Sequence, residues 1–351
     1  MTKQYGIGIV GFDHWYIARG VVEACQNNPR ARVVAVAHRD EPTITQYAAE
    51  KGISNVTTDY AAIAQRDDVD VVVTACPTSE NVELCIDAAR RGKQILSVKP
   101  CAMTVADADR LVAAVRDAGV RFYPFESYGR VSGQQPAIKR WIEEGRIGKP
   151  VSATVIQRAS LSGASQDWPG RKNENTWWRT PGKTPGGGWL DHAIYQVDHL
   201  RWLLDDEVTR ISGVTKTLVH PELQAGLEDF GVAIMEFRKG LVATIEVTWT
   251  APPSGGLSQT QLVGTEGQVV VDQTLSGKVS VSGKFDGPAN GGWSTFSPPW
   301  RAGGGQSGLD HVLDCIEGKA QPAATVEDAR ANLAVCLAFY EAARTGKAVT
   351  L

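Results

Sequence analysis

The sequence predicts a chain of two domains: an α/β domain built on a doubly wound parallel sheet over residues 1–123, and an α+β domain with a large open, mainly antiparallel sheet over residues 124–351. Three observations predict this fold class. The chain has 351 residues, enough for about two domains. Up to residue 123, short apolar runs alternate with helical stretches. Beyond it, segments rich in Val, Ile and Thr, joined by tight turns, dominate.

The apolar runs of the first half are almost continuous, as in strands covered on both faces of a sheet. They are expected at residues 5–10, 33–37, 69–74, 94–97 and 120–123, with helices at 17–27, 45–51, 60–65, 79–91 and 105–118. The last helix has Thr104 as its N-cap and Gly119 just beyond its end. Strands that alternate with helices of this length form right-handed βαβ units, which predicts a parallel sheet.

Strands dominate the second half, and tight turns between them make the sheet mainly antiparallel. The expected strands are 151–157, 232–238, 241–250, 258–264, 268–272 and 278–281, and the expected helices are 135–144, 190–204, 308–317 and 326–345. A glycine-rich stretch at 283–305 is predicted to be a surface loop.

Charge and composition exclude several classes of partner. The 36 Lys and Arg residues nearly balance the 39 Asp and Glu residues, which leaves a formal charge of −3. The basic surface typical of proteins that bind nucleic acid or anionic membranes is therefore not expected.

No apolar run approaches the roughly 18 residues of a membrane span, and the N-terminal stretch lacks the layout of a signal peptide. The six cysteines are scattered without a CxxC pair, which is typical of free thiols, so we expect a cytoplasmic protein.

The turn after the first strand is the first candidate site. Gly6, Gly8 and Gly11 match the pattern G-x-G-x-x-G, but the first two fall inside the expected strand, whereas a dinucleotide fingerprint belongs to the turn after it. Counted from Gly11, the next glycine positions hold Asp13 and Tyr16, and a carboxylate there opposes a pyrophosphate unless it turns away or caps the helix. The alternative is a plain turn. The candidate cofactor contacts are Gly11, Phe12, Asp13, His14 and Trp15.

The second strand ends in His38 and Arg39, which are also candidate cofactor contacts. NAD-selective sites usually have an acid here for the ribose hydroxyls, whereas an arginine can pair with the 2′-phosphate of NADP. His38 stands at the expected acid position, so the pair favours NADP(H) over NAD(H). A solvated arginine at a strand end is the alternative.

Lys99 follows the fourth of the expected strands. A lysine at the carboxyl end of a parallel strand points into the crevice where doubly wound proteins bind ligands. It could polarise a carbonyl or lower the pKa of a reacting hydroxyl. The alternative is a surface lysine.

Three glycines, 186–188, open the helix at 190–204 and would let its backbone approach a ligand closely. Asp191 and Tyr195 are four residues apart and share one face of this helix, where they form a plausible substrate clamp and proton donor. His192 lies about a hundred degrees round the helix, so it either reaches the same pocket or caps the helix. Metal binding by Asp191 and His192, or by Asp13 and His14, is not expected because adjacent side chains seldom converge on one ion.

Five of the ten tryptophans lie between residues 168 and 202, with basic residues among them. Aromatic faces suit sugar rings, and the basic groups suit an anionic substituent. The alternative is that Trp189 and Trp202 belong to the core and that the basic residues are solvated. The tryptophans are Trp168, Trp177, Trp178, Trp189 and Trp202, and the basic residues are Arg171, Lys172, Arg179 and Lys183.

Together these motifs resemble the Gfo/Idh/MocA oxidoreductase family over nearly the whole chain. The resemblance is carried by Lys99-Pro100, by Gly186-Gly187-Gly188-x-x-Asp191-x-x-x-Tyr195, by Cys76-Pro77-Thr78, by residues 142–150 and by Trp178-Arg179. It implies a Rossmann domain followed by a substrate domain, and NAD(P)-dependent hydride transfer at a hydroxyl or keto carbon of a sugar, sugar acid or cyclitol. It further implies that the open sheet is buried in a homodimer or homotetramer.

The resemblance also implies roles for single residues. Lys99 would assist proton transfer, Asp191 would hold the substrate and Tyr195 would carry the acid/base group. Cys76, Pro77, Thr78 and also Lys99 would line the cofactor site, and Trp178, Arg179 and His192 the substrate site.

Three departures from the family pattern mark a divergent branch. Val98 replaces a usual glutamate, Asn81 replaces a frequent histidine, and Tyr195 stands where histidine is common. A phenol has a pKa near 10, so a nearby Lys99 ammonium would help it to reach a working value. Two alternatives stay open. One is a glycosidase that oxidises and re-reduces its substrate through bound nicotinamide, and the other is a non-catalytic sensor of nucleotide or sugar.

Overall fold

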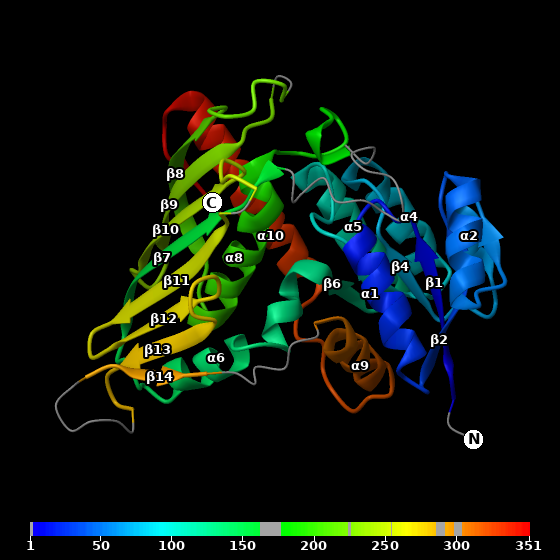
Figure 1. Ribbon diagram of the computed structural model, residues 1–351, viewed down its shortest axis with the longest axis horizontal. Helices are drawn as coiled ribbons and strands as arrows, with labels where there is room; N and C mark the ends of the chain where they lie inside the picture. Colours follow the sequence, from blue (N-terminus) through cyan, green and yellow to red (C-terminus); the bar gives the residue numbers. More distant parts are fainter. Residues whose placement is uncertain (1–2, 162–176, 224–225, 254, 286–291, 298–303) are drawn as a thin grey trace. The chain divides into compact units, whose positions relative to one another are not determined.

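The computed structural model describes residues 3–161, 177–223, 226–253, 255–285, 292–297 and 304–351. The chain forms two compact units, each with its own sheet (Figure 1). The first comprises Met1–Val131, Ser165–Pro185 and Gly303–Leu333, and the second Ser132–Ala164, Gly186–Ala302 and Ala334–Leu351. Two segments from the second half of the sequence therefore belong to the first unit.

The first unit contains a parallel sheet with the strands β1 (Tyr5–Val10), β2 (Ala31–Ala37), β3 (Val56–Thr57), β4 (Val71–Thr74), β5 (Gln94–Ser97) and β6 (Phe122–Pro124). Their order is β3-β2-β1-β4-β5-β6, that of a Rossmann domain, which confirms the predicted doubly wound sheet. The helices are α1 (Trp15–Gln26), α2 (Glu41–Lys51), α3 (Ala61–Gln65), α4 (Thr78–Arg90), α5 (Val105–Ala118) and α9 (Gly304–Ile316), with the short η1 (Phe125–Arg130) after β6.

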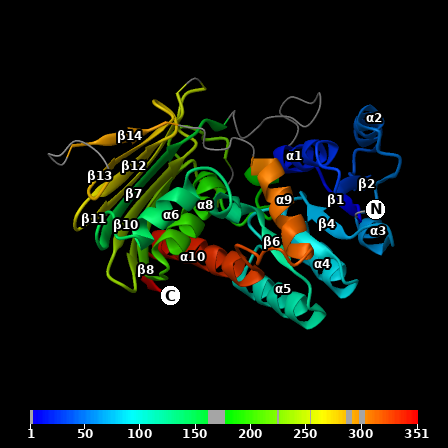
Figure 2. The ribbon, with the colours of Figure 1, turned by 90° about the horizontal axis from the view of Figure 1, so that it is seen from below.

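Helices cover both faces of this sheet. α1 packs against α9, and α4 packs against α3 and α5; α1 and α4 lie on opposite sides of the strands (Figure 2). The sequence placed α9 in the second domain, but its apolar residues Leu309, Val312 and Leu313 are buried in one core with Ile7 and Ile9 of β1. The local pattern indicates only that α9 is an amphipathic helix and not which core it joins.

The second unit contains a nine-stranded sheet in the order β14-β13-β12-β11-β7-β10-β9-β8-β15. Its strands are β7 (Pro150–Arg158), β8 (Val208–Lys216), β9 (Phe230–Phe237), β10 (Val242–Thr248), β11 (Leu257–Gly264), β12 (Gln268–Asp272), β13 (Lys278–Ser282), β14 (Ser294–Phe296) and β15 (Val349–Thr350). Only β7 and β10 pair in parallel, so the sheet is mainly antiparallel, as predicted.

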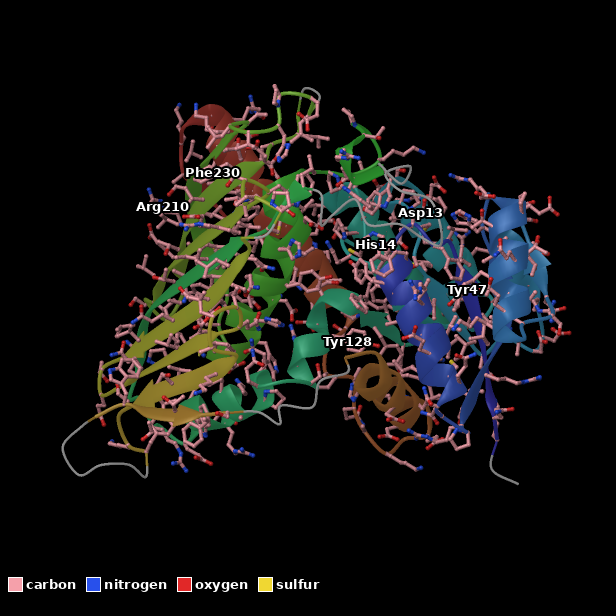
Figure 3. All side chains as sticks on the ribbon, in the orientation of Figure 1. Asp13, His14, Tyr47, Tyr128, Arg210 and Phe230 are labelled. Carbon is pink, nitrogen blue, oxygen red and sulfur yellow. The ribbon has the colours of Figure 1, made fainter. Side chains whose placement is uncertain are left out.

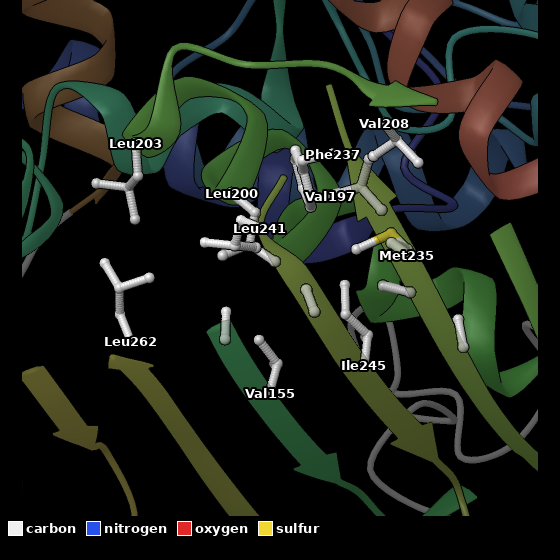
Figure 4. Packing of buried hydrophobic residues seen from close by; sticks show 14 of the residues in the cluster. Val155, Val197, Leu200, Leu203, Val208, Met235, Phe237, Leu241, Ile245 and Leu262 are labelled. Atoms are coloured by element: carbon white, nitrogen blue, oxygen red, sulfur yellow. The ribbon is translucent and has the colours of Figure 1, made fainter. Parts of the chain in front are cut away.

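One face of this sheet carries the core of the second unit. The helices α6 (Gln135–Glu143) and α8 (Gly188–Leu204) and the later part of α10 (Val326–Thr345) lie on this face. Val197, Leu200 and Leu203 of α8 belong to one buried cluster with Ile245 of β10 and Met235 of β9 (Figure 4). α8 is therefore fixed along its apolar side, and its other side is left to carry polar groups.

Four strands were not expected from the sequence: β3, β8, β14 and β15. The apolar residues of β8, Val208, Ile211 and Val214, stand three positions apart instead of alternating with polar ones, and β8 contains Gly213, whose added Cβ would lie 2.5 Å from the Phe339 ring. Such a glycine weakens the local β signal although tertiary packing requires it. β14 lies within the stretch 283–305 that was predicted to be a loop, and it joins the sheet through pairing with β13.

Candidate active site

The turn after β1 lies where the strand order reverses between β1 and β4. Gly11 has a φ of 78°, and an added Cβ would be 2.8 Å from both Cα and N of Cys76, just beyond β4. Only glycine combines this backbone conformation with this close approach. Gly6 and Gly8 lie inside β1 and contribute nothing to the turn. Dinucleotides bind at such reversal points, so the position of Gly11 fits a cofactor turn.

The residues after Gly11 lie in different environments. Phe12 is fully buried and packs edge-on against the Tyr47 ring with centroids 5.4 Å apart, so its side chain belongs to the core. His14 is 4% exposed, with Nδ1 3.2 Å from the Tyr16 hydroxyl. Trp15 begins α1, and Figure 3 shows Asp13 and His14 beside the start of this helix. Only part of the predicted set therefore offers side chains to a ligand.

The Asp13 carboxyl is the group that a pyrophosphate would meet. Burial, with the nearby Glu80 carboxylate adding to it, raises the pKa of Asp13 to about 7, against the opposing charges of Arg39 and Lys183. The carboxyl can therefore become neutral near physiological pH. The N-cap residue of α1 makes no side-chain hydrogen bond to the first turn, and the start of a helix is a common binding site for phosphate. The residues present thus fit a dinucleotide.

Arg39 does not point freely from the end of β2. Its guanidinium binds both carboxylate oxygens of Glu80 on α4 and lies 5.2 Å from the centre of the Tyr60 ring. Glu80 also accepts from Lys183 at 3.4 Å. His38 Nδ1 accepts the backbone N–H of Asp40 at 3.1 Å, which fixes the end of the strand. The Arg39 guanidinium, which could pair with the 2′-phosphate of NADP, is therefore already paired with Glu80.

The segment between β4 and α4 is buried. Cys76 is fully buried, and burial raises the pKa of its thiol well above the ordinary value, so it is not a nucleophile. Pro77 is the N-cap residue of α4 and Thr78 its first, buried residue. Asn81 donates to Ser97 Oγ at 2.9 Å and to the Cys101 carbonyl at 2.8 Å, which ties α4 to the end of β5.

Lys99 follows β5 and is 3% exposed. The alternative of a solvated surface lysine is therefore wrong. A buried ammonium is costly to desolvate, and the carboxyl end of a parallel strand is where doubly wound proteins bind ligands.

The glycines before α8 make room for the protein's own side chains. A Cβ on Gly186 would meet the Tyr340 ring, one on Gly187 would lie 2.5 Å from the Glu228 carbonyl oxygen, and one on Gly188 would lie 2.9 Å from the Trp249 ring. The close approach that these glycines allow is made by the protein's own atoms, and the predicted approach of a ligand stays a prediction. Their small size serves packing within the second unit.

Asp191 and Tyr195 lie on successive turns of α8, as their spacing predicts. Asp191 Oδ2 accepts from Trp249 Nε1 at 3.2 Å and lies 3.0 Å from His192 Nδ1. Trp249 is fully buried, whereas Asp191, His192 and Tyr195 are half-buried. The three half-buried groups therefore form a polar cluster that can reach a bound molecule. The ring of Tyr195 also packs against the core.

Two family models match the chain. One, described as an oxidoreductase family with an NAD-binding Rossmann fold, covers residues 5–125, and the other, the GFO/IDH/MocA C-terminal domain, covers residues 136–270. The chain is a member of the Gfo/Idh/MocA oxidoreductase family. The family resemblance seen in the sequence is thereby confirmed, together with an NAD-binding N-terminal domain.

Curated relatives of this Gfo/Idh/MocA protein act on sugars and cyclitols. A 1,5-anhydro-D-fructose reductase of Ensifer adhaerens is 29% identical over 87% of this chain and 86% of its own. An NAD⁺-dependent scyllo-inositol 2-dehydrogenase of Bacillus subtilis is 27% identical over 99% and 94%. A 2,7-anhydro-N-acetylneuraminate hydratase of Mediterraneibacter gnavus is 28% identical over 80% and 71%.

A solved structure of levoglucosan dehydrogenase with NADH and levoglucosan has the same fold, with a TM-score of 0.85, 22% identity and 99% of each chain covered.

In the described part of the Gfo/Idh/MocA protein, no helix is long and apolar enough to cross a membrane.

The segment Trp177–Arg179 forms a short 3₁₀ helix in the first unit. Trp177 is buried, and its ring lies 4.5 Å from that of His14. The buried Trp178 Nε1 and Arg179 Nε have no hydrogen-bond acceptor among the described residues, which leaves two donors for a ligand. Three residues of the predicted cluster, Trp168, Arg171 and Lys172, lie outside the described residues.

Sequence reasoning missed four residues that shape these sites in the Gfo/Idh/MocA protein: Glu80, Glu228, Trp249 and Tyr340. Glu80 could have been found as an acid in the first turn of α4. The other three lie about 40 to 150 residues from the glycines they contact, and no local pattern links them.

Proposed function

We propose that this protein is an NAD-dependent dehydrogenase or reductase that transfers hydride between the nicotinamide and a hydroxyl or keto carbon of a sugar, sugar acid or cyclitol. The observation that carries the proposal is the half-buried cluster on α8. There, Asp191 is held by the buried Trp249 indole, and Tyr195 lies one turn further along the same helix. The sugar- and cyclitol-acting relatives support the substrate class.

The residues divide the work as follows. Bound NAD supplies the hydride acceptor. The Asp191 carboxylate accepts hydrogen bonds from substrate hydroxyls, and His192 beside it contributes a further polar contact. The Tyr195 phenol exchanges the proton of the reacting hydroxyl, and Lys99 assists this transfer. Trp178 Nε1 and Arg179 Nε donate hydrogen bonds to the substrate, since neither has an acceptor among the described residues.

The test is a substrate panel assayed for both directions of the reaction. Scyllo-inositol, levoglucosan and 1,5-anhydro-D-fructose are each mixed with NAD⁺ or NADH, and the ultraviolet absorbance of NADH is followed. We expect stoichiometric formation or consumption of NADH with at least one member of this chemical class. Binding of NAD⁺ without turnover of any sugar, sugar acid or cyclitol would contradict the proposal.

A redox-neutral reaction is the second candidate, and the hydratase relative favours it. In this variant bound NAD would supply reversible oxidation of a ring hydroxyl, so that a group could be eliminated from the neighbouring carbons with no net change in the cofactor. Product would then form without net NADH. Chromatography of the sugar products, run beside the absorbance assay, separates the two reactions.

NAD(H) is proposed as the cofactor in preference to NADP(H). The sequence favoured NADP(H) because Arg39 follows β2, but the Glu80 carboxylate binds that guanidinium through both oxygens. A 2′-phosphate would have to displace Glu80, which would itself repel the phosphate. Titration of the protein's tryptophan fluorescence with each of the four nicotinamide nucleotides tests this preference.

The open sheet of the second unit is proposed as the contact between copies in a homodimer or homotetramer. On its helix-free face, Val214, Ile234 and Val242 are each at least 40% exposed, and Arg210 pairs with Glu236 among them. Figure 3 shows Arg210 and Phe230 on this sheet. Light scattering of the wild type and of Ile234→Asp tests it, because a charge on this face should split the oligomer.

The cytoplasm is proposed as the compartment. All six cysteines are free and buried, and a reducing compartment keeps them so. Fractionation of source cells, with the protein detected by antibody, tests this proposal.

A further inference from the structure

The helix α8 carries Asp191 and Tyr195. Groups from outside this helix hold its first turn. A helix leaves its first N–H groups without acceptors inside the helix. Here, Glu228 accepts three of these N–H groups. Its side chain accepts the N–H of Gly187 at Oε2 (3.2 Å) and that of Trp189 at Oε1 (2.9 Å). Its backbone carbonyl accepts the N–H of Gly188 at 2.7 Å. The N–H of Leu190 donates to the Tyr340 hydroxyl at 3.2 Å, and this hydroxyl donates to Glu228 Oε1 at 2.8 Å.

We propose that Glu228, with Tyr340, is a positioning residue for the reaction, because it sets where Asp191 and Tyr195 stand relative to Trp249. The proposal rests on the roles given to Asp191 and Tyr195 above. Glu228 itself is 5% exposed and touches no substrate by this proposal. It acts through the helix.

Glu228 and Asp229 are consecutive in the sequence, and each holds one partner of the contact between Asp191 and Trp249. The Glu228 side chain holds the start of α8, on which Asp191 is the next residue after the capped N–H groups. The carbonyl of Asp229 accepts the backbone N–H of Trp249 at 2.7 Å. A shift of Glu228 therefore changes the distance between Trp249 Nε1 and Asp191 Oδ2, which is 3.2 Å in this structure.

The charge of Glu228 matters because its partners are all hydrogen-bond donors. Burial raises the pKa of this carboxyl to about 7, although the N–H groups of Gly187 and Trp189 and the Tyr340 hydroxyl favour the ionised form. The described residues place no cation against it. The other titratable groups on this end of α8 are Asp191 and His192. Protonation would remove one acceptor from the cap, so the positioning weakens as pH falls below about 7.

A cap could also serve stability alone, and the chain offers a matched control for that case. Asp206 follows the other end of α8, is 8% exposed and accepts the N–H groups of Glu207 at 2.9 Å and Lys239 at 2.8 Å. It is a buried carboxylate with two backbone donors in the same unit, but it is remote in sequence from Asp191 and Tyr195.

The experiment compares Glu228→Gln, Tyr340→Phe and Asp206→Asn. The first readout is the indole N–H resonance of Trp249 in ¹⁵N-tryptophan-labelled protein, assigned with Trp249→Phe, which needs no substrate. The second is kcat and KM as a function of pH with a sugar or cyclitol from the panel. We expect Glu228→Gln to move the Trp249 resonance and to lower kcat by about 10- to 100-fold with a smaller change in KM.

The pH profile adds a signature that stability alone would not give. In the wild type, kcat should fall below about pH 7 as Glu228 takes up a proton, and Glu228→Gln should lack this limb. Tyr340→Phe should move the same resonance and lower kcat by about 3- to 10-fold. Asp206→Asn should lower the melting temperature while leaving the resonance and the kcat profile unchanged.

An unmoved Trp249 resonance in both Glu228→Gln and Tyr340→Phe, with a stability loss like that of Asp206→Asn, would overturn the proposal. If Glu228→Gln does not fold, Tyr340→Phe alone decides by the same criteria. If the wild type turns over nothing in the panel, the proposed function fails, but the Trp249 resonance still decides whether Glu228 positions Asp191.

Discussion

The starts of α1 and α8 are both preceded by glycine, but they are opposite in chemistry. α1 begins without a side-chain cap, beside a turn whose glycine has positive φ and lies against Cys76. α8 begins with its first N–H groups satisfied by Glu228 and Tyr340. The first end lacks a side-chain cap and is the proposed site for an anion, and the second is closed by the protein's own carboxylate.

This difference separates binding from chemistry in the proposed enzyme. A helix start without a side-chain cap can take the phosphates of a dinucleotide. A start whose N–H groups are held by Glu228 and Tyr340 has no such capacity, and the turns that follow it carry Asp191 and Tyr195. Glycine before a helix therefore indicates close approach without saying what approaches.

The largest expected effect is on the closed helix. Tyr195→Phe removes the proposed proton-transfer group, so kcat should fall by about 10²- to 10⁴-fold. Cofactor affinity should stay within about twofold, because the proposed cofactor site lies at the start of α1 and not on α8. Steady-state kinetics and a fluorescence titration with NADH measure the two quantities. Unchanged turnover would remove Tyr195 from its assigned role.

Gly187→Ala tests whether the glycines of α8 serve internal packing. Its Cβ would meet the backbone of Glu228, so we expect a loss of about 1–3 kcal/mol in the free energy of unfolding. The matched control is Gly20→Ala inside α1, where an added Cβ meets nothing within 4 Å. That change should stabilise by about 0.5–1 kcal/mol. Denaturant melts decide, and a stable Gly187→Ala would contradict the packing explanation.

Asp13→Asn tests the start of α1 through pH. The folded protein loses the Asp13 proton near pH 7 and the unfolded chain near pH 4, so stability falls as pH rises between these values. The carboxylate formed above pH 7 also opposes a pyrophosphate, so wild-type affinity for NAD⁺ should weaken from about pH 6 to about pH 8.

The variant should bind NAD⁺ about tenfold more tightly at the upper end of this range and show a flatter profile. Asp87→Asn, an exposed acid on α4 in the same unit, should leave the profile unchanged. A wild-type affinity that does not change with pH would argue against a pyrophosphate near Asp13.

The smallest expected effect concerns cofactor choice beside the start of α1. Glu80→Gln releases the Arg39 guanidinium, so affinity for NADP⁺ should rise by about three- to fivefold relative to NAD⁺, in keeping with the small energies of exposed ion pairs. Glu83→Gln on the same helix, which removes one of the two carboxylates paired with Arg110, is the matched control and should leave the ratio unchanged. Equal ratios in both variants would remove Glu80 as a determinant of cofactor choice.

Local patterns were enough to predict most elements of the first unit. The buried strands are continuous apolar runs, and each lies within a few residues of its expected position. Short strands such as β3 and β15 were missed because two residues carry no period. β8 was missed because its apolar residues do not alternate with polar ones and Gly213 weakens the local β signal.

The sequence by itself determined the parallel and antiparallel sheets, the turn at Gly11, the shared helix face of Asp191 and Tyr195, and the family pattern. These follow from periods of two and 3.6 residues and from short motifs. Three contacts depend on tertiary structure alone. Glu80 pairs with Arg39, and the Trp249 indole donates to Asp191. Glu228 and Tyr340 accept the first N–H groups of α8. Each of these contacts joins residues about 40 or more positions apart, so no local pattern in the sequence links them.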